Sequence, residues 1–346
     1  MNRRPPRNGE LQEKKINTLL VDGNALFKVG FFGAKNQYNH HGNHVGGLYQ
    51  FLTTLRKLLT EDIYHKVYVF WDGNLSGKLR YEFYSAYKSG RGKDYINGTY
   101  PIDESELLQR RVIWNYLSQM HIRQLIDEVV ESDDFIAYYC LNKKQNETIT
   151  IASTDRDFCQ LISNDIKIYF LDLKEYVGLS NFSSYFCFNQ GNSVLVKTMV
   201  GDTSDTIKGI KGLQEKTLVN LFPEIKERVV SLDEIIKMAI GKQEERISSK
   251  KKPIKVLENI INSTTDGVQK NKIYEINEKL VNLKKPLMTD NAVKELNELT
   301  NTSLNDNNRD LKNVMRMMER DGLDRIIGEH RYPEYLLPFK KLITRE

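Results

Sequence analysis

The chain contains little cysteine and no long apolar run. Its 346 residues include three cysteines, Cys140, Cys159 and Cys187, which are too widely separated for a disulfide framework or a zinc site. Scattered cysteines of this kind are typical of a reducing compartment. No apolar stretch approaches the about 20 residues needed to cross a bilayer, and none follows the basic N-terminus as in a secretory signal. We therefore expect a cytoplasmic protein without a membrane partner.

The excess of charge is also small, at +5 for the whole chain, so its distribution is more informative than its total. Residues 1–15 include Arg3, Arg4 and Arg7 and almost nothing apolar. This composition predicts a flexible basic arm, which either contacts nucleic acid or is simply solvated. The remaining length allows two domains or one large elaborated domain.

Three short apolar segments lead into acidic residues. Residues 16–21 precede Asp22, residues 67–71 precede Asp72, and residues 149–152 shortly precede Asp155. Short runs rich in β-branched and aromatic residues predict buried strands. If the three strands are parallel, their carboxyl ends meet at one edge of a sheet, which is where open α/β folds bind ligands.

Segments with helical spacing separate these strands. Residues 46–59 and 103–125 carry apolar side chains at intervals of three and four, which predicts helices that pack on a sheet. Residues 166–171 predict one more strand. The alternation of strands and helices predicts a Rossmann-like α/β fold with a parallel sheet flanked by helices. From residue 224 onward the chain is helix-rich and charged, and its last segment, 332–343, either packs back on a core or binds a partner.

A further acidic group lies between two of these strands. Glu131, Asp133 and Asp134 open a segment whose apolar pattern predicts a helix, and Asp157 follows Asp155 closely. Acidic residues often serve only as caps at helix N-termini. Two clusters that each begin where an apolar segment ends are better explained by a bound cation, because packed carboxylates repel one another.

The segment 77–95 combines basic and aromatic side chains. Its cations are Lys78, Arg80, Lys88, Arg91 and Lys93, and five tyrosine and phenylalanine residues lie among them. Cations and rings together suit a nucleic-acid strand, since the cations meet phosphates and the rings stack on bases. The alternative is an amphipathic helix with a solvated basic face.

A glycine-containing segment follows another acidic pair. Asp202 and Asp205 precede Gly209 and Gly212, and after these come Lys216 and Thr217 at the predicted start of a helix. Glycine turns beside a helix N-terminus offer backbone N–H groups to a phosphate. The segment therefore predicts a tight hairpin between two short helices that contacts nucleic acid.

These motifs resemble those of the flap-endonuclease-like 5′ nucleases, over about residues 16 to 222. The motifs are Val-Asp-Gly-Asn at 21–24, Glu-Ser-Asp-Asp-Phe-Ile-Ala at 131–137, Ser-Thr-Asp-Arg-Asp-Phe-Cys-Gln-Leu at 153–161 and Gly-Asp-Thr-Ser-Asp-Thr-Ile-Lys-Gly-Ile-Lys-Gly at 201–212. The segment 87–91 is most similar to the phage branch, which includes T-even phage ribonuclease H. The resemblance implies a PIN-like α/β domain at 16–197 with a helical arch at about 77–100. It also implies a helix–three-turn–helix element, which opens a second, C-terminal helical domain at 198–346.

One departure from the family pattern concerns the hairpin. The family usually has Gly-Ile-Gly where this chain has Gly212-Leu213-Gln214. If the backbone at Gln214 is left-handed, the side chain costs about 1 kcal/mol.

The resemblance also implies a metal site. Its acidic set matches, in order, Asp22, Asp72, Glu131, Asp133, Asp134, Asp155, Asp157, Asp202 and Asp205. Of these, Asp22, Asp72, Glu131, Asp133 and Asp155 would surround one ion, and Asp157, Asp202 and Asp205 would hold a second. Carboxylates without histidine or cysteine suit Mg²⁺, and Mn²⁺ is expected to be able to replace it. Lys88 and Arg91 resemble the family's basic pair at the scissile phosphate.

The function that the resemblance implies is a Mg²⁺-dependent 5′→3′ exonuclease and flap endonuclease of DNA replication and repair. Its substrates would be flapped or branched DNA and RNA/DNA duplexes. A replisome's single-strand-binding protein, polymerase or clamp would be its partner. We expect a monomer in the cytoplasm, which is the host's cytoplasm if the protein is phage-encoded. Two alternatives are a PIN-type single-strand ribonuclease and a non-catalytic scaffold that binds DNA junctions. The intact acidic set argues against the scaffold, since a binder has no use for so many repelling carboxylates.

Overall fold

The structure, a computed structural model, describes residues 15–92, 94–95, 103–263, 272–304 and 309–343. Its main sheet has the order β3-β2-β1-β4-β5-β6 and is parallel except for β6 at one edge. The strands are β1 (Ile16–Asp22), β2 (Lys66–Asp72), β3 (Arg123–Asp127), β4 (Glu147–Ser153), β5 (Ile166–Phe170) and β6 (Glu175–Val177). A short hairpin of β7 (Gly201–Asp202) and β8 (Ile207–Lys208) lies apart from the sheet. The predicted PIN-like α/β fold is confirmed.

Most other elements are helices. In the first half of the chain these are α1 (Gly23–Gly33), α2 (Gly46–Glu61), α3 (Lys78–Phe83), α4 (Glu104–Ser118) and α5 (Ser132–Leu141). The second half contains α6 (Ser193–Val200), α7 (Glu215–Leu221), α8 (Glu224–Glu227), α9 (Leu232–Ser248), α10 (Lys255–Asn262), α11 (Lys272–Val281), α12 (Asp290–Asn301), α13 (Leu311–Arg320), α14 (Asp324–Ile327) and α15 (Tyr332–Ile343). Short 3-10 turns include η1 (Ser89–Arg91), η2 (Arg156–Leu161), η3 (Leu179–Ser184), η4 (Gln190–Asn192) and η6 (Glu329–Arg331).

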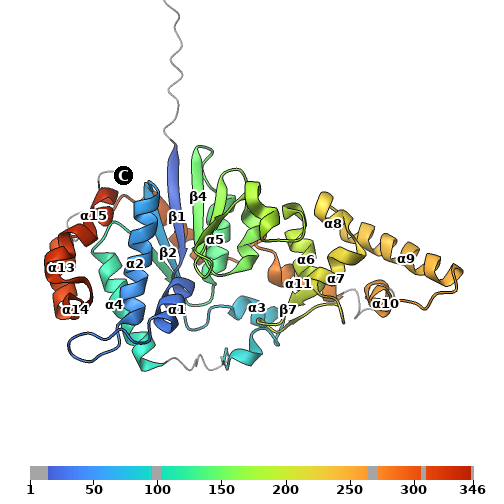
Figure 1. The fold of residues 1–346 in the computed structure, drawn as a ribbon, viewed down its shortest axis with the longest axis horizontal. Coiled ribbons are helices and arrows are strands. Elements are labelled where there is room, and N and C mark those ends of the chain that lie inside the picture. The colour runs from blue at the N-terminus through green and yellow to red at the C-terminus, as the bar shows by residue number, and fades with distance from the viewer. Residues whose placement is uncertain (1–14, 93, 96–102, 264–271, 305–308, 344–346) are drawn as a thin grey trace, which may run out of the picture.

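The sheet separates two hydrophobic cores. Successive strand residues point to opposite faces, so Leu20 and Phe70 enter one core whereas Leu19 and Val69 enter the other. In Figure 1, α1, α2 and α4 lie on one side of the strands, and α5 lies on the other. The predicted buried strands at 16–21, 67–71, 149–152 and 166–171 all form within one or two residues of the expected bounds.

One predicted helix is too long. We expected a helix over 103–125, but α4 ends at Ser118 and residues 123–127 form strand β3. This strand pairs with β2 at the edge of the sheet, with Tyr68 opposite Arg123. An edge strand is only half covered, so its sequence lacks the continuous apolar run that identified the central strands.

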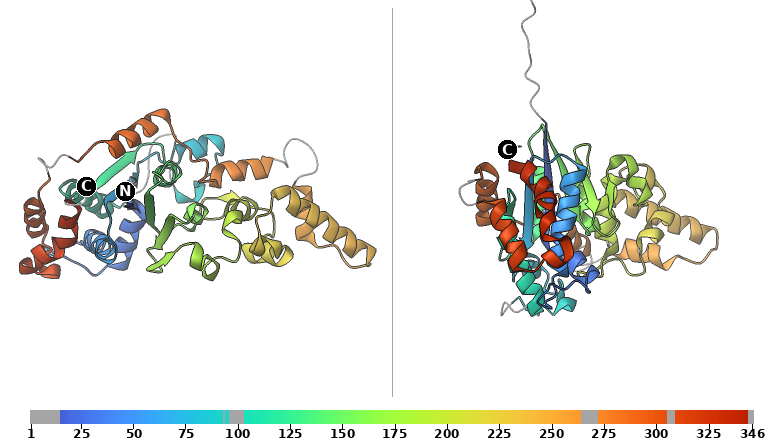
Figure 2. Two further views of the ribbon diagram at one scale, coloured as in Figure 1. Left: turned by 90° about the horizontal axis from the view of Figure 1, so that it is seen from above. Right: turned by 60° about the vertical axis from the view of Figure 1, so that its left-hand side comes forward.

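The C-terminal region does not form a separate body. We expected it to begin at residue 198 as a second domain, but α13 and α15 pack into the same core as α1, α2 and α4. Tyr335 in α15 exemplifies this packing, since its carbonyl accepts a hydrogen bond from Arg56 at 3.0 Å. Figure 2 shows the chain returning from the α9–α10 end, past α12, to the opposite end of the molecule. The last segment therefore packs on the protein's own core.

Some expectations concern features outside the sheet. The basic arm at 1–15 lies almost entirely outside the described residues, as does Lys93. In the described part of the arch, α3 and η1 are present. No helix in the described ranges is long and apolar enough to span a membrane. The three cysteines are free thiols.

Candidate active site

Three strands deliver carboxylates to one edge of the sheet. Asp22 ends β1 and Asp72 ends β2, while Asp155 lies two residues beyond β4. The register places Val21 opposite both Val69 and Ala152, so the carboxyl ends of the three strands are level. The Asp22 carboxylate accepts hydrogen bonds from the Ala25 amide at 2.9 Å and the Ser153 hydroxyl at 2.8 Å. Asp22, Asp72 and Asp155, which are far apart in the sequence, therefore lie close together in space.

Helix α5 adds two more acids to this edge. Glu131 is its N-cap and Asp133 lies in its first turn. The Ser132 amide donates a 2.8 Å hydrogen bond to the Asp72 carboxylate, which ties the start of α5 to the end of β2. Acids are favoured at this helix end, but here the same positions also face the strand-end carboxylates.

Four acids of this cluster resist ionisation: Asp22, which is buried, and Asp133, Asp155 and Asp157, which are half-buried. Burial raises the pKa of Asp22 to about 7, and the charges on Asp72 and Asp155 add to the effect. Burial likewise raises the pKa of Asp157 to about 7, with Asp155 contributing, and raises the pKa values of Asp133 and Asp155. Like charges withdrawn from water favour either a proton or a cation among them. The arrangement therefore has the electrostatic character of a cation site.

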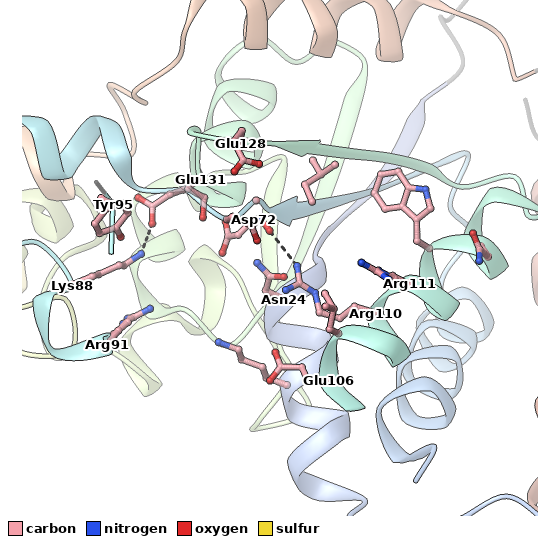
Figure 3. Close-up of a pocket in the computed structure, with 18 residues that line it drawn as sticks. Asn24, Asp72, Lys88, Arg91, Tyr95, Glu106, Arg110, Arg111, Glu128 and Glu131 are labelled. Atoms are coloured by element: carbon pink, nitrogen blue, oxygen red, sulfur yellow. Dashed lines mark hydrogen bonds and ion pairs between the residues drawn. The ribbon is translucent and has the colours of Figure 1, made fainter. Parts of the chain in front are cut away.

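Lys88 and Arg91 reach this cluster from the arch segment. The Lys88 ammonium contacts the Glu131 carboxylate and lies 3.9 Å from Asp205, and the Arg91 guanidinium lies 2.5 Å from Asp205. Figure 3 shows both side chains extending toward Glu131 and Asp72. Burial alone would raise the pKa of Glu131, but Lys88 and Arg80 lower it to about 2. The basic pair and the acidic set predicted from the sequence are therefore neighbours in space.

The Lys88 contacts rest on an unusual local backbone. Lys88 has a φ of 52°, in the left-handed region, and its amide donates a 2.9 Å hydrogen bond to the Asp205 carbonyl. Its neighbour Tyr87 is buried and donates its hydroxyl proton to Glu131 at 3.0 Å. Tyr87 is one of the aromatic residues of segment 77–95 that were expected to stack on bases, and its hydrogen bond to Glu131 was not predicted.

Lys197 is a second residue that the sequence analysis missed. Its ammonium lies 2.7 Å from both Asp157 and Asp202, bridging two acids assigned to the second ion. Although burial opposes ionisation, Lys197 lowers the pKa of Asp202 to about 2. A signal was present in the sequence, because Lys197 is the one charged residue in α6, which is otherwise apolar or hydroxylic.

Asp134 and Arg80 do not take the roles predicted for them. Asp134 was expected to bind metal and Arg80 to contact nucleic acid, but each is at most 5% exposed. Their side chains form a bidentate ion pair, with nitrogen–oxygen distances of 2.5 and 2.9 Å. The Leu287 amide also donates a hydrogen bond to Asp134 at 2.9 Å. Both oxygens of this carboxylate therefore already have partners outside the acidic cluster. The pair is a buried structural link.

The other residues predicted to contact nucleic acid lie in α3, in α7 and in the turn between α6 and α7. Lys78 forms only an exposed pair with Glu82 at 3.8 Å. Lys216 and Thr217 lie in α7, on the far side of the turn that follows α6. Gln214 is extended, with φ −116° and ψ 161°, so the expected left-handed strain does not arise.

Two glycines shape the turn between α6 and α7. A Cβ atom at Gly209 would lie 1.9 Å from the Val200 carbonyl oxygen, so only glycine fits there. Gly212 has a φ of +80°, which also favours glycine. The sequence identified both positions, and the structure supplies a steric reason for each.

The carboxylate oxygens of the acidic cluster are suitable ligands for a hard divalent cation. Their side chains do not, however, surround a common point in this structure. Carboxylate oxygens are the ligands that Mg²⁺ and similar ions prefer. In the part of the chain that the structure describes, no three histidine, cysteine or acidic side chains converge closely enough to hold an ion. The ammonium groups of Lys88 and Lys197 lie among the acids instead. Glu131, Asp157, Asp202 and Asp205 are thus paired with the protein's own cations in this structure.

Comparison with known proteins supports the assignment of the fold and the family. Residues 17–186 match the family described as the 5′-3′ exonuclease N-terminal, resolvase-like domain. A 5′-3′ exonuclease of Mycoplasmopsis pulmonis is 27% identical over 255 residues, which are 70% of this chain and 79% of that protein. Thermostable DNA polymerase I of Thermus caldophilus is 30% identical over 215 residues, 62% of this chain. The chain spans about a quarter of the length of that polymerase.

A solved structure shares the architecture over most of the chain. The T5 5′-exonuclease superposes with a TM-score of 0.60, at 16% sequence identity, and covers 89% of this chain and 97% of its own. That likeness concerns the fold, whereas the sequence match at 17–186 concerns the family. Residues 17–186 of this chain therefore belong to the 5′-3′ exonuclease family, in its N-terminal, resolvase-like domain.

Proposed function

We propose that the chain is a divalent-metal-dependent 5′→3′ exonuclease and flap endonuclease. It would hydrolyse phosphodiester bonds in DNA flaps and in the RNA of RNA/DNA duplexes during replication and repair. The observation that carries this proposal is the cluster of Asp22, Asp72, Asp133 and Asp155 at one sheet edge, with Lys88 beside it. Carboxylates that can hold divalent metal ions, beside a cation that can meet a phosphate, form one arrangement that catalyses phosphodiester hydrolysis.

Two groups of side chains would hold the metal. Asp22, Asp72, Asp133 and Asp155, with Glu131, form the first group, and Asp157, Asp202 and Asp205 form the second. When bound, Mg²⁺ or Mn²⁺ supplies an activated water and stabilises the leaving oxygen. In support, the T5 5′-exonuclease that shares this fold has been described with divalent metal ions bound.

The chain's own cations would act on the substrate. A metal ion among the acids would release Lys88 and Arg91 from Glu131 and Asp205, since it neutralises the same carboxylates. Both side chains could then meet the phosphate, where Lys88 offers a compact charge and Arg91 a planar fork. The turn containing Gly209 and Gly212 would grip the backbone of the duplex through its exposed N–H groups.

A panel of labelled substrates tests this proposal. Purified protein would be incubated with a 5′-flap DNA duplex, an RNA/DNA duplex and a single-stranded RNA, each with Mg²⁺ or with EDTA. We expect Mg²⁺-dependent cleavage near the flap junction and stepwise release from 5′ ends. Cleavage of single-stranded RNA alone would indicate a PIN-type ribonuclease, and tight flap binding without cleavage would indicate a scaffold. Size-exclusion chromatography with light scattering would test the expected monomer.

A further inference from the structure

A pocket of about 490 Å³ lies at Asp72 and Glu131, and Lys88 and Arg91 from the arch segment also line it. One of its walls is a single face of α4, formed by Leu107, Arg110, Arg111 and Trp114. Residues spaced by three, four and seven positions share one face of a helix. Ile126 from β3 lies across from them. The pocket therefore joins the acidic cluster directly to a mixed aromatic and basic surface (Figure 3).

The apolar part of this surface is unusually open. Leu107 is 39% exposed and Ile126 is 44% exposed, although both line the same pocket. Trp114 is only partly buried. Exposed aliphatic side chains beside an accessible indole form a platform suited to a flat ring, because a nucleobase can stack on it whatever its sequence.

The basic part of the surface is held in place. Arg110 donates a 3.1 Å hydrogen bond to the Asp72 carbonyl, and its guanidinium lies 5.7 Å from the centre of the Trp71 ring. Arg111, one residue on, is exposed. In Figure 3, Glu128 lies above the two arginines and Glu106 lies below them, so at this end of the pocket a phosphate would be favoured at the level of the arginines rather than beside either acid.

We propose that this pocket binds one unpaired nucleotide of a single strand that runs past the acidic cluster. The base would stack against Trp114 between Leu107 and Ile126, and the phosphate would lie beside Arg111. The volume is within the range of about 300–1,000 Å³ that small-ligand sites occupy. This inference rests on the proposed function, and it adds a specific site for the first unpaired nucleotide of a flap.

Tryptophan fluorescence in EDTA tests the proposal without relying on cleavage. The chain has two tryptophans, and Trp71 is only 2% exposed, so quenching by added DNA reports chiefly on Trp114. The full-length protein would be titrated with a 5′-flap duplex, with the same duplex without a flap, and with flaps that carry an abasic site. One abasic site would replace the first unpaired nucleotide, and another would replace the fifth.

We expect the flap to quench the signal, and the abasic site at the first position to remove most of the quenching. Trp114→Ala should weaken flap binding by about 5- to 100-fold, the range for losing one stacked base. Trp114→Phe should keep most of the affinity while losing the quenching. Leu108→Ala is the matched control, because Leu108 is 61% exposed on α4 but does not line the pocket.

Three results would overturn this inference: quenching that is equal with and without a flap, equal effects of the two abasic sites, or unchanged flap affinity in Trp114→Ala. If Trp114→Ala fails to fold, as judged by its thermal transition, Trp114→Phe and the abasic substrates still decide. Failure of the proposed function would look different, since it would leave binding and quenching intact while cleavage with Mg²⁺ is absent.

Discussion

Lys88 places its ammonium against Glu131 and close to Asp205, which puts a positive charge within reach of a phosphate at the site. If it neutralises charge that develops in the transition state, Lys88→Ala should lower the single-turnover cleavage rate by roughly 100-fold. Flap affinity should fall far less, because other cations still hold the strand. Lys174→Ala is the control, since Lys174 is exposed and has a similar φ of 58°. An unchanged rate at saturating enzyme would remove Lys88 from the catalytic residues.

Arg80 links the base of the arch to two acids of α5. Its guanidinium contacts Glu131 at 2.6 Å and Asp134 at 2.5 Å, inside the protein. Arg80→Met would leave both carboxylates without this partner, so the free energy of unfolding should fall by about 3 kcal/mol or more. Denaturant unfolding would measure the loss, and Lys78→Met in the same helix should change stability by less than about 0.5 kcal/mol. Equal stabilities of the two variants would show that the buried pair is not needed.

Where two residues of the same type lie in one segment, the sequence could not show which of them reaches the acidic cluster. The sequence located the acids at strand ends because each strand is a short apolar run that stops at an acid. It could not separate Asp133 from Asp134, since adjacent helical residues point about 100° apart and only the fold decides which side meets the strands. Arg80 was grouped with Arg91 because both are basic residues of one segment, although Arg80 is buried against Glu131 and Asp134 whereas Arg91 is exposed beside Asp205.

The turn between α6 and α7 depends on close backbone contact. A methyl group at Gly209 would collide with the Val200 carbonyl, so Gly209→Ala should lower the free energy of unfolding by about 1–3 kcal/mol and weaken duplex binding. Gly241→Ala in α9 is the matched control, because nothing lies within 4 Å of its added methyl group. That substitution should stabilise the protein by up to about 1 kcal/mol. Both effects can be read from denaturant midpoints, and a neutral Gly209→Ala would contradict the steric argument.

The segment 280–283, which includes the end of α11, shows how the C-terminal part of the chain is joined to the main sheet's core. Side chains of the nuclease core bind its backbone directly: Arg80 donates to the Leu280 carbonyl at 2.9 Å, and Gln160 bonds to both Val281 and Leu283. Such contacts between side chain and backbone leave no periodic pattern in the sequence of the segment. The central strands and α2 could be predicted because their apolar spacing is itself the cause of their burial.

The charge state of the whole acidic edge predicts how metal-free protein responds to pH. Asp22 and Asp157 have folded-state pKa values of about 7, above the ordinary aspartate value, so the folded protein binds more protons than the unfolded chain between about pH 4 and 7. Stability in EDTA should therefore decrease as pH rises through 7. Glu131 and Asp202, with pKa values near 2, lose their contribution only at more acidic pH.

Thermal unfolding at pH 5.5 and 8 would measure this effect. Mg²⁺ should oppose the loss, because it binds the ionised carboxylates, so its stabilising effect should be larger at pH 8 than at pH 5.5. Asp22→Asn should flatten the pH dependence in EDTA. A stability in EDTA that rises steadily from pH 5.5 to 8 would contradict the description of these acids as buried and mutually repelling.

The central claim is that the strand-end carboxylates perform metal-dependent cleavage. It is tested most directly by comparing Asp155→Asn with Asp165→Asn, whose carboxyl group is on the surface and pairs with Lys143 at 3.2 Å. Single-turnover cleavage of a 5′-flap duplex would be measured at saturating Mg²⁺, together with flap affinity in EDTA. We predict that Asp155→Asn abolishes cleavage with nearly unchanged affinity, while Asp165→Asn cleaves like the parent protein. Near-normal cleavage by Asp155→Asn would contradict the assignment of this edge as the active site.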